Sequence, residues 1–184
     1  MGNGIAHVAA LAGYNVLLND QDETRVDAGL ATIERNMTRQ VHREMITQQD
    51  MEAALPRIKK AKTLGDFASV DLAIESVVEK EEAKRAIFMA LRPVLHPDAL
   101  LASNTSSISI TRLAASTDRP EKFIGVHFMN PVPLMKLVEL IRGLATSQET
   151  YDVTLAFVKT LGKTIANAED FPAFIVNRVL VPMI

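Results

Sequence analysis

One histidine and one glutamate in the second half of the sequence have the chemistry of a general base and of the carboxylate that orients it. Glu139 lies on one face of a predicted strand over 136–141, and burial of that face obliges its carboxylate to find a partner. The turn NPVP at 130–133 returns the chain as an antiparallel pair and brings His127 opposite Glu139. A carboxylate at one ring nitrogen fixes the tautomer and makes the other nitrogen a better base. The alternative is a structural histidine in a strand.

Three further polar side chains stand where a ligand could meet them. Ser106 and Asn130 follow predicted strands, and open parallel sheets gather ligand contacts at the carboxyl ends of their strands. The alternative role for either residue is a helix cap or an Asx turn. Asn177 lies in an apolar helix, where its amide is costly without a hydrogen-bond partner. We therefore expect a partner for it, which could be a substrate.

The elements that must position these residues alternate between strand and helix. This alternation predicts an α/β fold with a mostly parallel sheet and helices on both faces. The predicted strands cover 15–19, 71–75, 100–103, 123–128, 136–141 and 163–168. The predicted helices are Gly4 to Ala12, a long helix capped by Asp22, a helix after Glu79 and a helix ending before Gly162.

Local patterns make two of these helices specific. The helix after Glu79 has an apolar rhythm, which predicts its buried face. The residues of that face are Ala83, Ala86, Ile87, Ala90 and Leu91. The letters TSQE at 146–149 match a capping box and predict that the last of these helices is capped by Thr146.

The N-terminal residues indicate a dinucleotide site. Gly2 and Gly4 open a helix of small residues, as in a glycine loop whose helix faces a pyrophosphate. Asp20 ends the next strand, where this fold places an acid on the adenine ribose, and no arginine follows it to receive a 2′-phosphate. The sequence thus predicts NAD rather than NADP. The alternatives are a nucleotide-free helix start and an aspartate that only caps a helix.

Composition excludes several other classes of protein. The chain is 48% hydrophobic and 23% charged, with a net charge of −2 and no basic stripe for nucleic acid or an anionic membrane. It has no cysteine, which excludes a disulfide framework, a thiolate zinc site and a cysteine nucleophile, and we expect no metal. It has no apolar run of membrane-spanning length. We expect a small-molecule partner and a cytoplasmic location.

The sequence resembles the 3-hydroxyacyl-CoA dehydrogenase family, including the bacterial 3-hydroxybutyryl-CoA dehydrogenases, along nearly all of its length. The resemblance is carried by Asp20 and by the stretches MGNGIA, SVVEKEEAK, SNTSSISI, GVHFMNPVPLMKLVELI and FIVNRVLVP. It implies a Rossmann-like NAD domain over 1–170, followed by the start of an all-helical dimerisation domain over 171–184. It also implies NAD as cofactor, a 3-hydroxyacyl-CoA or 3-oxoacyl-CoA as substrate, and a homodimer.

The resemblance also implies a role for each site residue. His127 would be the base that takes the hydroxyl proton, and Glu139 would hold it. Ser106 and Asn177 would position the substrate oxygens, with Ser106 also near the nicotinamide. The other implied contacts are Gly2, Asp20, Glu79 and Asn130 to the cofactor, Lys84 to both NAD and coenzyme A, and Asn36 and Arg43 to coenzyme A. The alternative for Glu79 and Lys84 is a pair on a polar helix surface.

The sequence departs from the family pattern at three places. The family's first strand and the first two glycines of its loop are absent from this sequence, which predicts that Leu17 and Ile74 lack a neighbouring strand. The mostly apolar stretch from Phe171 onward indicates either a buried terminal helix or a helix cut off from its domain. Ala173 stands where the family usually has glycine.

Three other functions remain as alternatives. They are a non-catalytic NAD-binding or structural member of the same family, a dehydrogenase of another small hydroxy acid, and a serine hydrolase built on Ser106 and His127. The last is disfavoured because the sequence has no G-x-S-x-G elbow.

Overall fold

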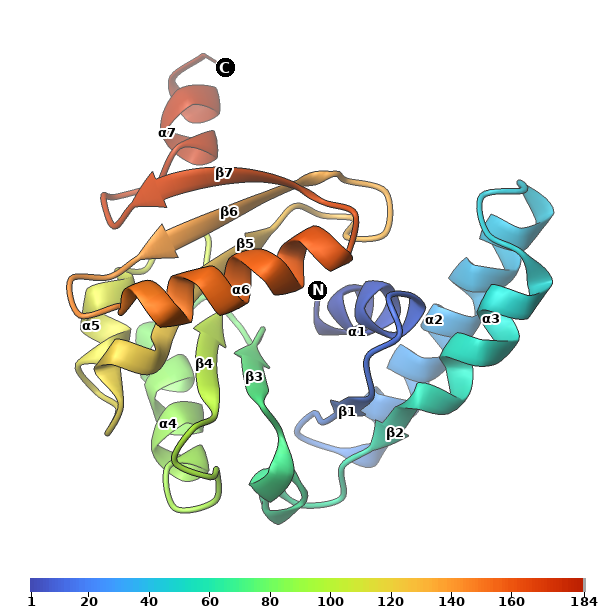
Figure 1. Cartoon of the computed structure of the whole chain (residues 1–184), viewed down its shortest axis with the longest axis horizontal. Helices are drawn as coiled ribbons and strands as arrows, with labels where there is room; N and C mark the ends of the chain where they lie inside the picture. Colours follow the sequence, from blue (N-terminus) through green and yellow to red (C-terminus); the bar gives the residue numbers. More distant parts are fainter. Residues whose placement is uncertain (184) are drawn as a thin grey trace. The chain divides into compact units, whose positions relative to one another are not determined.

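The computed structural model describes residues 1–183 and divides into two compact units. The first unit contains Met1–Asp66 and Asn130–Met135, and the second contains Phe67–Met129 and the described residues from Lys136 onward. Both units are drawn in Figure 1. No helix within residues 1–183 combines the length and apolar character that crossing a bilayer requires. The predicted domain boundary after residue 170 stays a prediction, and Ile184, the last residue of the predicted helical segment, lies outside the described residues.

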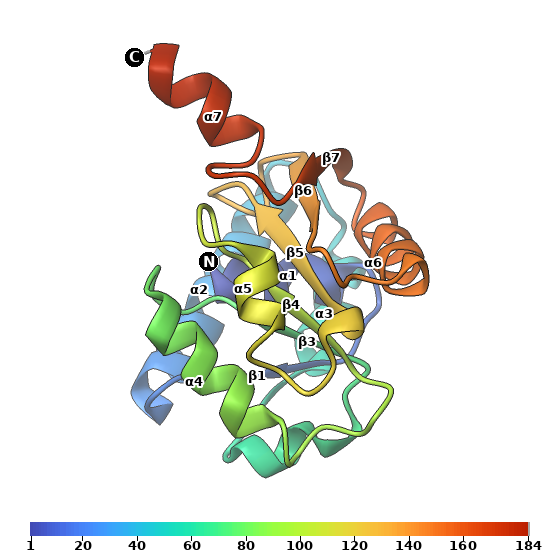
Figure 2. The same cartoon turned by 90° about the vertical axis from the view of Figure 1, so that its left-hand side faces the viewer.

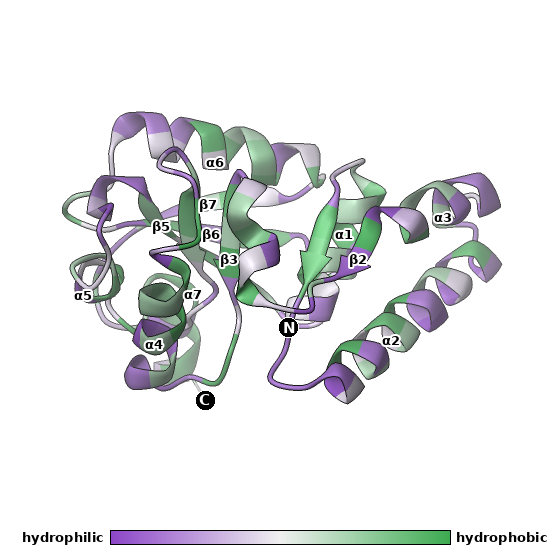
Figure 3. Ribbon diagram, turned by 90° about the horizontal axis from the view of Figure 1, so that it is seen from below, coloured by the Kyte–Doolittle hydropathy of each residue, from purple (hydrophilic) through white to green (hydrophobic). Residues whose placement is uncertain are grey.

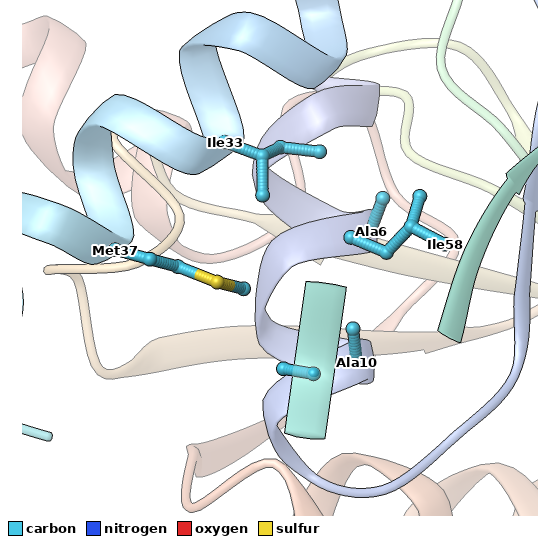
Figure 4. Close-up of a cluster of buried hydrophobic side chains, with 6 residues drawn as sticks. Ala6, Ala10, Ile33, Met37 and Ile58 are labelled. Carbon is cyan, nitrogen blue, oxygen red and sulfur yellow. The ribbon is translucent and has the colours of Figure 1, made fainter. Parts of the chain in front are cut away.

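The first unit packs three helices on a two-stranded parallel sheet. Its elements are α1 (Gly2–Leu11), β1 (Val16–Leu18), α2 (Glu23–His42), α3 (Gln48–Ala54), a short 3-10 helix (Leu55–Arg57) and β2 (Ile58–Lys60). The side chain of Asp22 accepts a hydrogen bond from the Arg25 amide, which confirms the predicted cap of α2. Buried residues of α1, α2 and α3 meet β2 in the core of this unit (Figure 4): Ala6, Ala10, Ile33, Met37, Ala54 and Ile58.

The second unit is built on a five-stranded sheet in the order β3-β4-β5-β6-β7. Its elements are a 3-10 helix that begins in the first unit (Leu64–Ser69), β3 (Leu72–Glu75), α4 (Glu81–Leu91), β4 (Leu100–Ser103), α5 (Ile110–Ala114), a 3-10 helix (Pro120–Lys122), β5 (Phe123–Phe128), β6 (Leu137–Arg142), α6 (Gln148–Thr160), β7 (Thr164–Glu169), α7 (Val176–Leu180) and a last 3-10 helix (Val181–Met183). All neighbouring strands are parallel except β5 and β6, which are antiparallel. The mostly parallel sheet and the antiparallel return are thus confirmed.

Helices cover both faces of this sheet. In Figure 2, α4 and α5 lie on one side of the strands and α6 lies on the other. Close packing of α5 depends on Gly125, because a Cβ there would come within 2.8 Å of the Ile110 side chain. Figure 3 colours α2 and α6 alternately hydrophilic and hydrophobic along their length, as expected of helices with one buried face.

Leu17 and Ile74 each lie in a strand at the edge of its own sheet, as predicted. Within residues 1–183, β1 pairs only with β2, and β3 pairs only with β4. Leu17 and Ile74 therefore lie in strands with one unpaired edge, and both side chains are partly exposed.

Two local predictions are wrong. Helix α4 buries Lys84, Phe88 and Leu91, whereas Ala86 and Ala90 of its predicted apolar face are exposed. The observed buried face differs from the predicted one because the ammonium of Lys84 pairs with carboxylates inside the unit. The spacing of apolar residues alone cannot predict a buried lysine.

The predicted capping box of α6 is also wrong. Ser147 caps α6 by accepting a hydrogen bond from the Thr150 amide. The hydroxyl of Thr146 instead donates to the Phe123 carbonyl at 2.7 Å and accepts from the Gly143 amide. Thr146 therefore ties the end of β6 to the start of β5, and the cap moves one residue along.

Candidate active site

A buried histidine and glutamate face each other across β5 and β6. His127 and Glu139 are direct partners in the antiparallel register, so their side chains leave the sheet on the same face. His127 Nδ1 lies 2.7 Å from Glu139 Oε2, the side chain of Glu139 is fully buried, and that of His127 is 9% exposed. An ionised carboxylate can only accept, so Nδ1 carries the proton of this bond.

The geometry leaves the second ring nitrogen of His127 available. Among residues 1–183, none makes a hydrogen bond to its Nε2. With the proton on Nδ1, the lone pair of Nε2 is the basic site of the ring. The pair can therefore accept a proton from a group placed at Nε2, while Glu139 stabilises the charge that this transfer creates.

Glu139 is held by the chain that follows β7 as well as by His127. Its second oxygen, Oε1, accepts hydrogen bonds from the amides of Ile175 at 2.9 Å and Val176 at 2.8 Å. Its burial is therefore matched by three donors, as a buried charge requires. The sequence did not reveal these donors, because backbone amides carry no residue signal.

Several hydrogen-bond donors of the turn after β4 bind one carboxylate oxygen, that of Glu79. Glu79 Oε1 accepts from the hydroxyl of Thr105 at 2.5 Å, and from both the amide and the hydroxyl of Ser106 at 2.8 and 3.1 Å. The amide and the hydroxyl of Ser107 donate to the same oxygen at 3.1 and 3.0 Å. The turn therefore keeps its shape through Glu79, and Thr105 and Ser107 are site residues that the sequence reading did not single out.

These donors change the acidity of Glu79. Partial burial opposes ionisation, but the hydrogen bonds from Thr105 and Ser106 and the charge of Lys84 outweigh it and lower the pKa of Glu79 to about 2. The carboxylate is thus ionised across the whole neutral range. A permanently charged acceptor is well suited to keeping the turn in one conformation.

Lys84 lies inside the second unit, under this turn. Its Nζ is 2.9 Å from Glu75 Oε1 and 3.3 Å from Glu79 Oε2, and its side chain is 1% exposed. Ser103 completes the cluster by donating to Glu75 Oε2 at 2.6 Å. A surface pair of Glu79 and Lys84 is therefore excluded. Contact of Lys84 with NAD or coenzyme A stays a prediction that this burial does not favour.

Glu75 is the member of this cluster that the sequence analysis overlooked. It is the last residue of β3 and pairs in register with Ser103, the last residue of β4. A glutamate that ends an otherwise apolar strand beside a second strand ending in serine was the available signal.

Ser106 and Asn177 meet in the structure. The side-chain amide of Asn177 donates to the backbone carbonyl of Ser106 at 3.1 Å. The hydrogen bond expected for Asn177 thus exists, and its partner is the turn after β4 rather than a ligand. A further link, from the Phe128 amide to Asn104 Oδ1 at 2.8 Å, joins the same turn to the end of β5 next to His127.

The predicted adenine-side residues belong to the first unit. Gly2 is the first residue of α1, and the N-cap residue Met1 makes no side-chain hydrogen bond to the helix start. Asp20 is exposed after β1, and within residues 1–183 its carboxylate accepts only from the Gln21 amide. Free amides at a helix start fit a phosphate, and an open carboxylate fits ribose hydroxyls, so these residues fit NAD.

The remaining predicted contacts lie at the surface of the same unit. Asn36 is half-buried on α2, Arg43 is exposed at its C-cap, and Asn130 is exposed in the turn after β5. Their assignments to coenzyme A or cofactor stay predictions.

Comparison with known proteins connects this arrangement to one group of enzymes. Residues 1–171 match the family model for the NAD-binding domain of 3-hydroxyacyl-CoA dehydrogenase. The chain is 61% identical over its whole length to a 3-hydroxybutyryl-CoA dehydrogenase of Bradyrhizobium diazoefficiens, and 44% identical to a probable 3-hydroxybutyryl-CoA dehydrogenase of Bacillus subtilis. It spans 63% and 64% of the lengths of these two proteins.

A solved structure shows the same fold. The crystal structure of (S)-3-hydroxybutyryl-CoA dehydrogenase from Ralstonia eutropha superposes with a TM-score of 0.97 at 44% identity, covering all of this chain and 65% of that one. The Rossmann-like expectation is thereby confirmed.

Proposed function

Because the chain belongs to the family of 3-hydroxyacyl-CoA dehydrogenase NAD-binding domains, we propose that it acts in the NAD-dependent interconversion of an L-3-hydroxyacyl-CoA, such as 3-hydroxybutyryl-CoA, and the 3-oxoacyl-CoA. The observation that carries the proposal is the buried pair of His127 and Glu139 with Nε2 left unbonded by residues 1–183. The family and the named relatives supply the substrate class.

The chemistry divides between the cofactor and the chain. NAD, when bound, supplies the hydride acceptor. Nε2 of His127 takes the proton of the substrate 3-hydroxyl while carbon 3 gives up its hydride to the cofactor. Carbon 3 and its oxygen thereby become a carbonyl group. In the reverse direction His127 returns this proton to the carbonyl oxygen. Glu139 holds the ring in the required tautomer and stabilises the imidazolium.

We assign the other residues supporting roles. Glu79 fixes the turn that carries Ser106, and Asn177 fixes the carbonyl of the same serine. The Ser106 hydroxyl donates to Glu79 in this structure, and we propose that it also contacts the substrate oxygen when substrate is bound. Gly2 and Asp20 would contact the pyrophosphate and the adenine ribose of NAD. A homodimer, formed through the helical domain that the resemblance implies, and a cytoplasmic location, with which the absence of cysteine is compatible, complete the proposal.

The test is the reduction of acetoacetyl-CoA by NADH, followed by NADH absorbance. We expect activity in the wild-type protein and a loss of about 10²- to 10⁴-fold in His127→Gln, the usual contribution of a general acid or base. His96→Gln is the matched control, because His96 precedes the start of β4, whereas His127 lies near the end of the parallel neighbour β5, so the two histidines are at opposite ends of these strands. Near-normal turnover in His127→Gln would refute the assignment of the base.

Binding of NADH without turnover in the wild-type protein would favour the non-catalytic alternative. Turnover of a small 2-hydroxy acid in place of the CoA ester would favour another dehydrogenase. Both outcomes come from the same preparation by exchanging the substrate.

A further inference from the structure

A five-residue stretch after β7, Ala173–Asn177, contacts three of the proposed site residues. We call it the 173–177 segment. Its amides bond Glu139, its phenylalanine lies against His127, and its asparagine bonds Ser106. These three residues come from three different parts of the second unit. One short stretch of chain therefore touches the base, the carboxylate that orients it and the serine turn.

The amides of the segment decide which way Glu139 presents its oxygens. The bonds from Ile175 and Val176 both end on Oε1, which leaves Oε2 for His127 Nδ1. Without them a fully buried carboxylate would have one donor and would be free to turn about its terminal torsion, which is soft. Two amides at the start of α7 also place partial positive charge beside the carboxylate.

The backbone of the segment is shaped for this contact. Ala173 has φ +66° and Phe174 has φ +50°, so two successive residues are left-handed. The turn is closed by hydrogen bonds from the Phe174 amide to the Phe171 carbonyl and from the Arg178 amide to the Ala173 carbonyl. Each left-handed residue other than glycine costs about 1–2 kcal/mol, so contacts elsewhere must offset this cost. The bonds to Glu139 are such contacts.

Phe174 limits the imidazole in a second way. Its side chain is 3% exposed, and its ring centroid lies 6.2 Å from that of His127 with the planes tilted by 58°. The phenyl ring is therefore a buried neighbour of the imidazole, and we infer that it restricts the rotamers open to His127. Because Nδ1 is fixed by Glu139, the direction of Nε2 depends on that rotamer.

We propose that the 173–177 segment is a positioning element for the dyad, and that Phe174 is a positioning residue of His127. The segment orders Glu139 through two amides and blocks rotation of the imidazole through one aromatic ring. The proposal rests on the proposed function, because it assigns these contacts to the orientation of the catalytic base. The orientation of the dyad then depends on the backbone conformation of the residues that follow β7.

The first experiment changes the aromatic ring. Phe174→Ala removes the contact with His127, and Phe171→Ala is the matched control because Phe171 lies two residues before the 173–177 segment and is exposed. We expect Phe174→Ala to lower kcat by about tenfold with little change in KM, since small misplacements of a catalytic group reduce the rate more than binding. Phe171→Ala should behave as wild type. Equal kcat in both variants would overturn the role of Phe174.

The second experiment removes one amide. Val176→Pro lacks the N–H that bonds Glu139, and it also disfavours the αR backbone of Ile175 before it, so it disturbs this contact in two ways; Val176→Ala keeps the N–H. The readout is the low-field proton NMR signal of His127 Nδ1–H, which reports its bond to the carboxylate. We expect the signal to broaden or vanish in Val176→Pro and in Phe174→Ala but to persist in both controls.

The two readouts separate this inference from the proposed function. A signal that is present in wild type and unchanged in Phe174→Ala and Val176→Pro overturns the inference and leaves the proposed reaction intact. If the signal is lost in those two variants but the wild-type protein has no dehydrogenase activity, the positioning role of the segment is supported and the proposed reaction is contradicted. Amide exchange of Ile110 and Thr111, which bond Asp170, shows that the second unit remains folded in each variant.

Discussion

His127 and Glu139 occupy directly opposed positions on β5 and β6, and a 2.7 Å hydrogen bond joins their side chains in the interior of the second unit. Apart from Arg142 at the end of β6, the other residues of both strands are apolar and mostly buried, so the pair is a polar contact in apolar surroundings that the sheet holds in fixed register. Such a pair has no freedom to separate by strand slippage, because a shift of one residue would send the side chains to opposite faces.

The double variant of the dyad tests whether its two members act as one unit. We expect Glu139→Gln to lower the rate of acetoacetyl-CoA reduction by about 10²-fold or more, because the neutral amide no longer stabilises the imidazolium. The double variant His127→Gln/Glu139→Gln should be no slower than His127→Gln alone, since a carboxylate without its base has nothing to orient. Losses that multiply in the double variant would show two independent roles.

Glu79 makes the stability of the protein depend on pH in a defined window. Its pKa is lowered to about 2 from 4.5 in the folded protein, so on acidification the unfolded chain binds the proton first. The stabilisation is complete above about 4.5 and is lost as the pH falls toward about 2. In urea titrations across this window, the unfolding free energy of Glu79→Gln should fall less steeply than that of wild type. Glu82→Gln, at an exposed position on α4, should follow wild type, and identical slopes in all three proteins would contradict the account.

The buried ammonium of Lys84 predicts an unusually destabilising substitution on a helix. Lys84→Met leaves the Glu75 carboxylate buried without its cation, which costs about 3–5 kcal/mol. Arg85→Met is the neighbouring control, because Arg85 is half-exposed and its pair with Glu81 contributes below about 1 kcal/mol. Urea unfolding measures both values. Similar losses in the two variants would mean that the Lys84 cluster is not the buried charge network described above.

Ala173 predicts a stabilising substitution in the 173–177 segment. At φ +66° an alanine side chain is strained and a glycine is not, so Ala173→Gly should stabilise the local turn by about 0.5–1 kcal/mol after allowing for the greater freedom of glycine in the unfolded chain. The measurement is hydrogen exchange of the Ile175 and Val176 amides, which should slow by roughly two- to fivefold. Faster exchange in Ala173→Gly would show that alanine is not strained there.

The sequence indicated the dyad in two ways. The turn between the two predicted strands made a pairing of His127 with Glu139 possible, and the resemblance to the family implied it; the observed antiparallel register places the two residues opposite each other. The strands at 100–103 and 123–128 were predicted with their observed bounds, since they are apolar runs bounded by polar residues or breakers.

What could not be predicted depends on contacts distant in sequence. A lysine on a helix is normally predicted to be exposed. The burial of Lys84 depends on its ion pair with Glu75, which lies at the end of β3. Strand β2 has three residues, two of them exposed lysines, and carries no alternation to detect. The left-handed Ala173 and Phe174 have residue types that favour the right-handed region, so tertiary contacts decide their conformation.

The position of the proton on the uncharged His127 ring decides whether Nε2 can act as the base. It can be read from the two imidazole ¹⁵N resonances of the folded protein, assigned by comparison with His127→Gln, and we expect the proton on Nδ1 and none on Nε2. In Glu139→Gln this preference should weaken, because the carboxylate that selects the tautomer is gone. A proton on Nε2 in the wild-type protein would contradict the proposal that this nitrogen is the base.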